Sequence, residues 1–330
     1  MANLTTKYLG LNLKNPLIVG SSGLTNSVEE ITEIEKKGAG AVVLKSIFEE
    51  EILLEHKSIM NEVAADENNL EYYDYFDYKI KQDNINKYIK LIKDVKKAVQ
   101  IPVIASVNCT SAHEWTFFAK KIEEAGADAI ELNAFILPSD LNRTAEQNEK
   151  IYFDLINTVK KEVNIPIALK ISYYFSNLAV MIKKLSETGI DGLVLFNRFY
   201  SPDFDIDTQK VVSTHVLSSE NDLPISLRWV AIMANRVKCD IAASTGVHNG
   251  QALIKQLLAG ADAVQVVSAL YKHGTSHIES MLKELEDWMD KNNYQNIAAF
   301  KGNMSQENSY DPAAFERVQF MKYFGEIKHS

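Results

Sequence analysis

Apolar and polar positions along this chain fall into two short phrases that alternate from end to end. One phrase is a glycine, a tight turn and a run of apolar residues; its copies begin at Gly38, Gly126, Gly189 and Gly260. Each copy follows a segment with helical spacing, which indicates a helix-ending glycine and then a buried strand. The other phrase is a short apolar strand, and three of its four copies carry a proline at the start, where the ladder does not yet need an N–H. Together the phrases predict eight strands, within 15–22, 38–45, 101–108, 126–133, 165–170, 189–197, 239–245 and 260–268.

Helical patterns separate these strands. They cover 27–37, 84–99, 112–125, 145–163, 177–188, 225–237, 250–259 and 276–292. Alternating strands and helices predict a parallel sheet, and eight such units favour closure into a (β/α)8 TIM barrel of the α/β class. An open doubly wound sheet is the alternative, but the segment after the first strand, Gly20-Ser-Ser-Gly23, is not the Gly-x-Gly-x-x-Gly loop typical of that fold.

Three segments extend the regular repeat. Residues 49–83 follow the second strand and are rich in acids and tyrosines, and residues 198–224 follow the sixth. Long connections of this kind are usually lids or binding loops. A C-terminal extension, 301–330, can pack on the barrel or on a partner subunit, which would make a homodimer. No linker is visible, so residues 1–330 are expected to form a single domain.

Polar or small residues end all eight strands. They are Ser21, Ser22, Lys45, Ser46, Asn108, Asn133, Lys170, Asn197, Ser244, Thr245, Gly246 and Ser268. Solvent exposure would explain any one of them, but it explains poorly two lysines and three asparagines with no acid at the same positions. Because the carboxyl ends of barrel strands form the active-site face, we expect a pocket there for a neutral or anionic planar ligand.

The ends of the last two strands add a phosphate signal. Thr245, Gly246, Val267 and Ser268 lie where many barrels bind phosphate, and small residues let backbone N–H groups approach phosphate oxygens. An ordinary tight turn would explain Thr245 and Gly246 alone, but the two loops together favour phosphate binding.

Composition narrows the remaining possibilities. The net charge of −9 argues against nucleic-acid binding, and no apolar stretch reaches the ~20 residues of a membrane span. Two cysteines, Cys109 and Cys239, and an N-terminus without a signal-peptide pattern indicate a reducing, cytoplasmic location. The seven histidines form no zinc-type cluster, so no metal site is expected. His248 alone adjoins a strand-end motif and is interpreted as a loop residue.

From about Leu9 to Met304 the chain resembles the soluble class 1 dihydroorotate dehydrogenases. The similarity lies in residues 15–17 with 22–23, 44–46, 131–133, 168–170, 197, 245–252 and 261–270. The resemblance implies an FMN-dependent oxidoreductase acting on a CH–CH bond, oxidising dihydroorotate to orotate in pyrimidine biosynthesis. It implies a small dihydropyrimidine-like substrate and a soluble electron acceptor, such as fumarate or a quinone.

The resemblance also implies roles for individual residues. Lys170 would stabilise the reduced flavin, Lys45 would contact flavin and substrate, and Asn133 and Asn197 would hydrogen-bond both; these four are the catalytic candidates. The residues expected to bind FMN are Ser22, Gly23, Lys45, Ser46, Asn108, Asn133, Lys170, Thr245, Gly246, Val267 and Ser268.

The chain departs from the family pattern where a Cys or Ser base is expected after the fourth strand. Ile136 and Leu137 stand there, and neither takes up a proton; Ser139 and Cys109 are the nearest alternatives. An acidic, tyrosine-rich segment, 68–78, replaces the substrate loop, and 218–222 replaces a glycine-rich loop. The acidic segment would repel dihydroorotate unless Arg198 or Lys45 compensates. Two further hypotheses are therefore a flavin oxidoreductase with another substrate and a barrel that binds FMN or phosphate without turnover.

Overall fold

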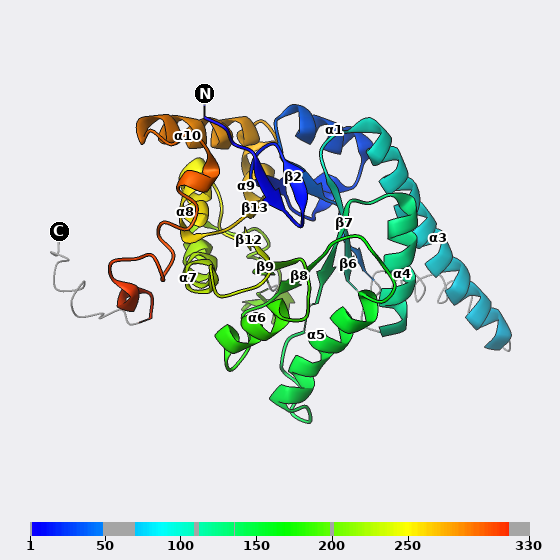
Figure 1. Cartoon of the computed structure of the whole chain (residues 1–330). Helices are drawn as coiled ribbons and strands as arrows, with labels where there is room; N and C mark the ends of the chain where they lie inside the picture. The colour runs from blue at the N-terminus through cyan, green and yellow to red at the C-terminus, as the bar shows by residue number, and fades with distance from the viewer. Residues whose placement is uncertain (1, 49–69, 109–111, 135, 199–200, 317–330) are drawn as a thin grey trace.

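Eight parallel strands close into a barrel in the computed structural model, which describes residues 2–48, 70–108, 112–134, 136–198 and 201–316 (Figure 1). Of residues 70–82 and 112–116 only the helical backbone is described. The barrel strands are β3 (Leu17–Val19), β4 (Ala41–Val43), β6 (Val103–Asn108), β7 (Ala129–Asn133), β8 (Ile167–Ile171), β9 (Gly192–Leu195), β12 (Asp240–Ser244) and β13 (Ala263–Val266). Each strand pairs with the next along the chain, and β13 pairs with β3, which closes the circle. The predicted fold class is confirmed, since every strand lies within or one residue beyond its predicted range.

Helices surround the barrel and follow the strands in the expected order. They are α1 (Val28–Lys36), α3 (Leu70–Ala98), α4 (Ala112–Ala125), α5 (Ala145–Val159), α6 (Leu178–Ser186), α7 (Leu223–Met233), α8 (Gly250–Ala259) and α10 (His277–Lys291). Apolar residues between strands and helices form the larger core. Among the described residues, no helix combines the length and the apolar character that crossing a membrane requires.

Helix α3 corrects the prediction that 49–83 is a loop throughout. It is helical from Leu70, because neither glycine nor proline interrupts 70–98 and the tyrosine-rich stretch continues the helix without a break. Residues 49–69 lie outside the described part of the chain. The connection after β9 was also predicted to be long, and it contains a short hairpin of β10 (Asp203–Asp205) and β11 (Lys210–Val212).

A hairpin that the sequence patterns did not predict closes the N-terminal end of the barrel. It consists of β1 (Thr6–Tyr8) and β2 (Leu11–Leu13), joined at Leu9 and Gly10, both with positive φ. Its buried apolar side chains belong to a second core, which fills the barrel interior. Gly192 makes room for the hairpin, since a Cβ there would lie 2.5 Å from Leu9 Cδ2.

Part of the C-terminal extension packs on the barrel. The backbone N–H groups of Gly302 and Met304 donate to carbonyls at the end of α8, and that of Gln306 donates to Ala231 O in α7. A short helix, Pro312–Phe315, follows. Residues 317–330 lie outside the described part of the chain.

Carboxylates in the turns before strands fasten neighbouring strands together. Asp128 Oδ2 accepts a 2.7 Å hydrogen bond from Val103 N, Asp191 Oδ2 accepts from Ile167 N, and Asp262 Oδ2 accepts from Ile241 N. In each case the aspartate lies just before one barrel strand. It accepts a hydrogen bond from a backbone N–H at the start of the neighbouring strand that comes earlier in the chain. The repeated Gly-x-Asp phrase is therefore a structural requirement of the barrel.

The barrel interior changes from apolar to polar along its axis. Its lower layer consists of small and branched apolar residues, among them Ile18, Val43, Ile104, Ala129, Ala168 and Ala263. Because side chains alternate along a strand, residues two positions further on face the same interior. Those positions carry Ser106, Glu131, Lys170, Ser244 and Gln265, all buried. This polar layer lies at the C-terminal ends of the strands.

Replacing Asp128 by Ala is expected to destabilise the protein by about 1–3 kcal/mol, because Val103 N loses its acceptor at the start of a buried strand. Lys96 also loses its carboxylate partner. Asp94→Ala is the matched control, since Asp94 pairs with an exposed lysine, Lys90, and its loss should change stability much less. Urea unfolding of both variants measures the difference, and equal midpoints would contradict the proposed role of Asp128.

Candidate active site

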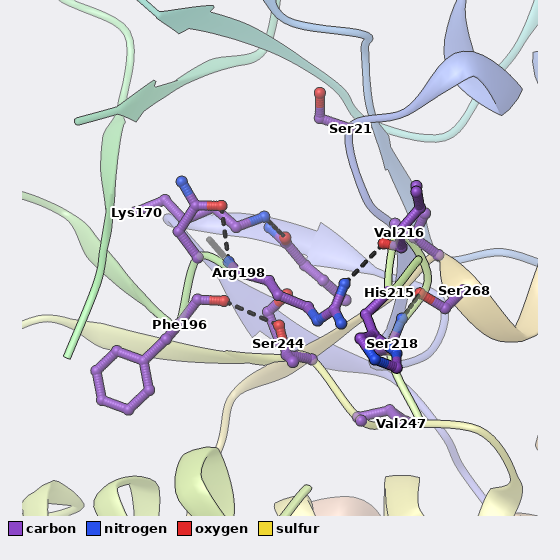
Figure 2. Close-up of a pocket in the computed structure, with 15 residues that line it drawn as sticks. Ser21, Lys170, Phe196, Arg198, His215, Val216, Ser218, Ser244, Val247 and Ser268 are labelled. Atoms are coloured by element: carbon purple, nitrogen blue, oxygen red, sulfur yellow. Dashed lines mark hydrogen bonds between the residues drawn. The ribbon is translucent and has the colours of Figure 1, made fainter. Parts of the chain in front are cut away.

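A cavity of about 280 Å³ opens at the C-terminal ends of the strands, where the polar layer meets the loops (Figure 2). Its lining residues are Ser21, Lys170, Phe196, Asn197, Arg198, His215, Val216, Ser218, Ser244, Thr245, Gly246, Val247, Gln265, Val267 and Ser268. The structure thus brings together six of the site residues predicted from the sequence: Lys170, Asn197, Thr245, Gly246, Val267 and Ser268. Gln265, Ser218 and His215 are lining residues that were not predicted.

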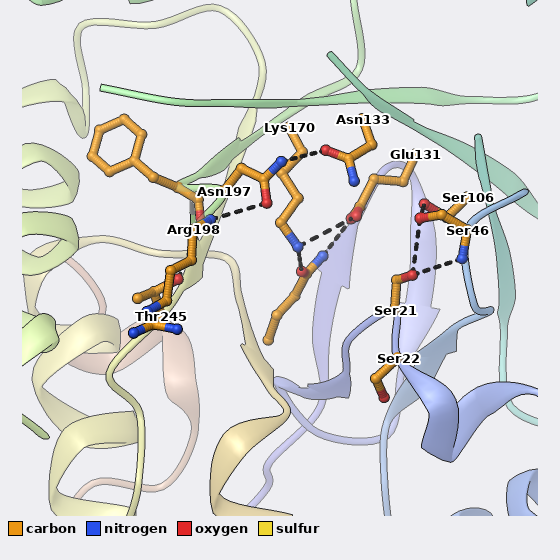
Figure 3. A network of polar contacts seen from close by, with 12 residues as sticks. Ser21, Ser22, Ser46, Ser106, Glu131, Asn133, Lys170, Asn197, Arg198 and Thr245 are labelled. Carbon is orange, nitrogen blue, oxygen red and sulfur yellow. Dashed lines mark hydrogen bonds and ion pairs between the residues drawn. The ribbon is translucent and has the colours of Figure 1, made fainter. Parts of the chain in front are cut away.

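Lys170 lies at the centre of a buried network with Gln265 and Glu131 (Figure 3). Lys170 Nζ donates to Gln265 Oε1 at 2.8 Å and lies 3.5 Å from Glu131 Oε1. Gln265 Nε2 donates to the other oxygen of Glu131, Oε2. No acidic residue stands at the strand ends themselves, and the prediction from the sequence considered only those terminal positions. Glu131 lies two positions before the end of β7 and faces the same interior.

The two asparagines predicted to act together are in direct contact. Asn197 Nδ2 donates to Asn133 Oδ1 at 2.5 Å, and Asn197 Oδ1 accepts from Arg198 N at 2.9 Å. Asn133 is buried at the end of β7, whereas Asn197 reaches the cavity. The remaining amide N–H groups are donors for a ligand that lies over the strand ends.

A chain of serine hydroxyls crosses the first three barrel strands. Ser21 Oγ lies 3.0 Å from Ser46 Oγ, which lies 2.7 Å from Ser106 Oγ in the buried layer. The Tyr88 hydroxyl donates to Ser106 O and accepts from Ser106 N, which fixes α3 to β6. Ser46 therefore supports the cavity wall through Ser21 and does not line the cavity itself.

The other predicted residues of this wall lie beside the cavity. Ser22 begins the short helix Gly23–Thr25, where its Oγ accepts from Leu24 N. A Cβ on Gly23 would lie 2.7 Å from the Tyr271 hydroxyl. Lys45 is half-buried, and its backbone N–H donates to Thr25 O. Asn108 is half-buried at the end of β6.

The two loops expected to hold phosphate follow the neighbouring strands β12 and β13, and both line the cavity. Thr245 and Gly246 both have positive φ, and a Cβ on Gly246 would lie 2.2 Å from Leu223 N, so this turn requires glycine. Ser268 was predicted to end the eighth strand, but β13 ends at Val266 and Ser268 begins the short helix α9 (Ser268–His273). Val267 interrupts the strand because its backbone leaves the extended region, with φ −138° and ψ −65°.

His248 and Lys272 fix the loop that carries Ser218. The Ser218 hydroxyl lies 3.1 Å from His248 Nε2, its N–H donates to Ser268 Oγ, and its carbonyl accepts from Lys272 Nζ. His248 was interpreted as an ordinary loop residue, but its side chain is buried and supports this wall of the cavity. The signal in the sequence that could have indicated this role was the position of His248, three residues after Thr245.

The charge at the cavity suits an anion. Lys170, Arg198 and His215 line it, and the lining set drawn from the described residues contains no aspartate or glutamate. Arg198 Nη1 donates to Val216 O at 2.7 Å, which leaves further guanidinium N–H groups in the same region. No group of three or more potential metal ligands occurs in the part of the chain that the structure describes.

The segment where a proton-accepting residue was expected is apolar. Ile136 packs on the main core, and Leu137 is 53% exposed. Ser139 is exposed, and Cys109 lies outside the described residues. Nearby, burial raises the pKa of Tyr152 to about 12, so that phenol is protonated at neutral pH. Tyr152, Tyr173 and Phe175 line an outer cleft of about 450 Å³ next to Ile136.

Comparison with known proteins gives one consistent family. The sequence profile described as "Dihydroorotate dehydrogenase" matches residues 3–289. The chain is 28% identical over 314 residues to "Dihydroorotate dehydrogenase B (NAD(+)), catalytic subunit" of Thermoplasma volcanium, covering 92% of this chain and 98% of that protein. Proteins of the same name are 27% identical in Thermoplasma acidophilum, with 92% and 99% coverage, and 26% identical in Methanocaldococcus jannaschii, with 88% and 94% coverage. The matched range contains all eight barrel strands.

Stability should depend on the protonation of His248. Burial and then Lys272 lower the pKa of His248 below 6.5, its value in the unfolded chain. As the pH falls below 6.5 the unfolded chain binds a proton first, so the folded protein loses stability progressively until the folded pKa is reached. Urea unfolding between pH 7.5 and 5.5 should show a smaller loss for His248→Gln than for the parent. His215→Gln, in an exposed position of the cavity rim, is the control, and parallel curves for H248Q and the parent would contradict the assignment.

Proposed function

This chain belongs to the dihydroorotate dehydrogenase family, and we propose that it is an FMN-dependent oxidoreductase that converts dihydroorotate to orotate. The observation that carries the proposal is the position of Lys170. Lys170, 8% exposed as a residue, holds its ammonium group inside the barrel mouth, in a cavity that the two small-residue loops also line.

The residues fit FMN by their chemistry. Thr245, Gly246, Val267 and Ser268 would hold the phosphate, with Arg198 as a further cationic donor. Ser21, Ser22, Gly23 and Ser46 would line the flavin, with Lys45 and Asn108 at the neighbouring strand ends. Asn133 and Lys170 would face the polar edge of the ring. This arrangement combines an anion site with amide and hydroxyl donors, which is the donor set that a flavin mononucleotide requires.

When bound, FMN supplies a two-electron acceptor for a hydride. Lys170 places positive charge where negative charge develops, in a site shielded from water. Asn133 and Asn197, joined by their own hydrogen bond, would orient a planar ring through their remaining amide groups. Arg198 and Lys45 would compensate the carboxylate of dihydroorotate. The substrate loses a hydride from one carbon and a proton from its neighbour, and a C=C bond forms.

A second candidate is a flavin oxidoreductase with another substrate, and the apolar segment at Ile136 and Leu137 favours it. Neither side chain takes up the proton that the dihydroorotate reaction releases. Tyr173 and Tyr174, whose rings lie 4.8 Å apart, border the cleft on that side. Such a surface suits an apolar or aromatic substrate better than an anionic pyrimidine.

The electron acceptor is proposed to be a small soluble compound. The names of the relatives in Thermoplasma and Methanocaldococcus specify NAD(+) and a catalytic subunit. We propose that this chain also passes its electrons to a small soluble acceptor such as NAD(+).

The absorption spectrum of the purified protein tests both candidates. We expect the two visible bands of oxidised flavin, and bleaching of both when dihydroorotate is added without oxygen. A flavin that stays oxidised with dihydroorotate but bleaches with another reduced compound would support the second candidate. A colourless protein that takes up no FMN on reconstitution would exclude both.

Lys170→Gln is expected to slow reduction of the bound flavin about 10²–10³-fold, because the charge is lost while a donor to Gln265 remains. Lys183→Ala, which removes an exposed lysine on α6, is the control and should reduce at the parental rate. Anaerobic stopped-flow mixing measures the rates, and urea unfolding checks that the variant is folded. Reduction of K170Q at the parental rate would contradict the role of Lys170.

A further inference from the structure

We infer that Glu131, acting through Gln265, positions Lys170 and thereby sets the reduction potential of the flavin at this site. The inference rests on the proposed function. Glu131 is a positioning residue here, because its carboxylate contacts Gln265 and Lys170 and does not line the cavity.

Gln265 connects the lysine and the carboxylate in only one orientation. Its carbonyl oxygen accepts from Lys170 Nζ, and its amide nitrogen donates to Glu131 Oε2. The ammonium has no acceptor function and the ionised carboxylate has no donor function, so the reversed amide would break both hydrogen bonds. Gln265, on β13, therefore reaches across the barrel and links two opposite charges on the neighbouring strands β7 and β8.

The fold provides space for this linkage. A Cβ at Gly20 would lie 2.9 Å from Val267 Cγ2 and 3.4 Å from Gln265 Oε1. The neighbouring strand thus leaves the Gln265 side chain free to reach across to Lys170. Ser106, the residue paired with Glu131 in the sheet register, is small and fills the next interior position.

Stability alone does not account for the carboxylate. Glu131 is 1% and Gln265 2% exposed, and Glu131 Oε1 accepts no hydrogen bond among the described residues, although it lies within ion-pair distance of Lys170. Burying an ion pair costs desolvation energy that a set of apolar residues would avoid. A charged residue kept in this position therefore acts on the group that faces the cavity.

The effect on a flavin follows from the sign of the charges. An uncompensated ammonium beside the ring favours the electron-rich reduced form. Glu131 offsets part of that charge and holds the ammonium through Gln265, which lowers the preference for the reduced form. Removing only the negative charge should raise the reduction potential.

The experiment compares Glu131→Gln with the parent as FMN-loaded proteins. Equilibration with a reference dye during anaerobic reduction measures each potential. We expect the ratio of reduced to oxidised flavin at a fixed potential to rise about tenfold in E131Q, about 30 mV for a two-electron couple. Glu162→Gln, an exposed glutamate in the turn before β8, is the matched control and should leave the potential unchanged.

The same substitution in a Lys170→Gln background tests whether Glu131 acts through the lysine. The shift caused by E131Q should shrink to less than half when Lys170 is absent. An unchanged potential in E131Q, or an equal shift in both backgrounds, would overturn the inference even if the parent is yellow and is bleached by dihydroorotate. A parent that binds no FMN would overturn the proposed function and, with it, this inference.

Unfolding provides a measurement that needs no cofactor. E131Q leaves a buried ammonium without its counter-charge, whereas E131Q/K170Q leaves two neutral amides. The double variant should therefore unfold at a higher urea concentration than E131Q. A double variant that is less stable than E131Q would contradict the coupling between these side chains, including where E131Q alone is too unstable to purify.

Discussion

An ammonium group inside a parallel barrel is the constraint on which the site depends. A charge removed from water needs an opposite charge and hydrogen-bond partners nearby, and the strands supply them at Glu131 and Gln265. Neighbouring strands contribute serine hydroxyls to the same layer, where Ser46 and Ser106 contact one another. Within the described residues, Glu131 Oε1 has the ion pair with Lys170 in place of a hydrogen bond. The cavity is therefore largely formed by side chains that the barrel holds in place.

The half of the barrel interior nearer the N-terminal ends of the strands is apolar, and it supports the polar layer above it. Small residues such as Ala129, Ala168 and Ala263 fill the narrow interior, and the N-terminal hairpin covers its base. The hairpin and the apolar residues exclude water from the N-terminal end of the barrel. The loops after the strands form the cavity at the other end. The loop that carries Ser218 is held by His248, Lys272 and Ser268, which connects the region after β9 to the small-residue loops after β12 and β13.

The sequence was sufficient to predict the barrel, because seven of the eight strands repeat a phrase with a glycine or proline at its start. It was also sufficient to predict that Lys170, Asn197 and the two small-residue loops would meet at one cavity, since they stand at strand ends. Glu131 and Gln265 were not predicted as partners of Lys170, because they lie inside strands and not at strand ends. Side chains alternate along a strand between the barrel interior and the helices, and only this alternation would have placed both of them in the interior. A glutamate in the otherwise apolar stretch Ala129–Asn133 was the available signal. The hairpin at residues 6–13 was missed because its apolar positions are few and its turn, Leu9-Gly10, is not a common hairpin pair.

The hairpin at the base also has a consequence for biosynthesis. Leu9 N donates to Asp240 Oδ2 across 231 residues of sequence, and the Leu9 side chain packs against Gly192. At roughly 5–20 residues per second, the ribosome needs about 10–50 s between making these two partners. The hairpin of β1 and β2 is synthesised long before the strands that it contacts. Closure of the barrel is therefore a late step in the folding of the nascent chain.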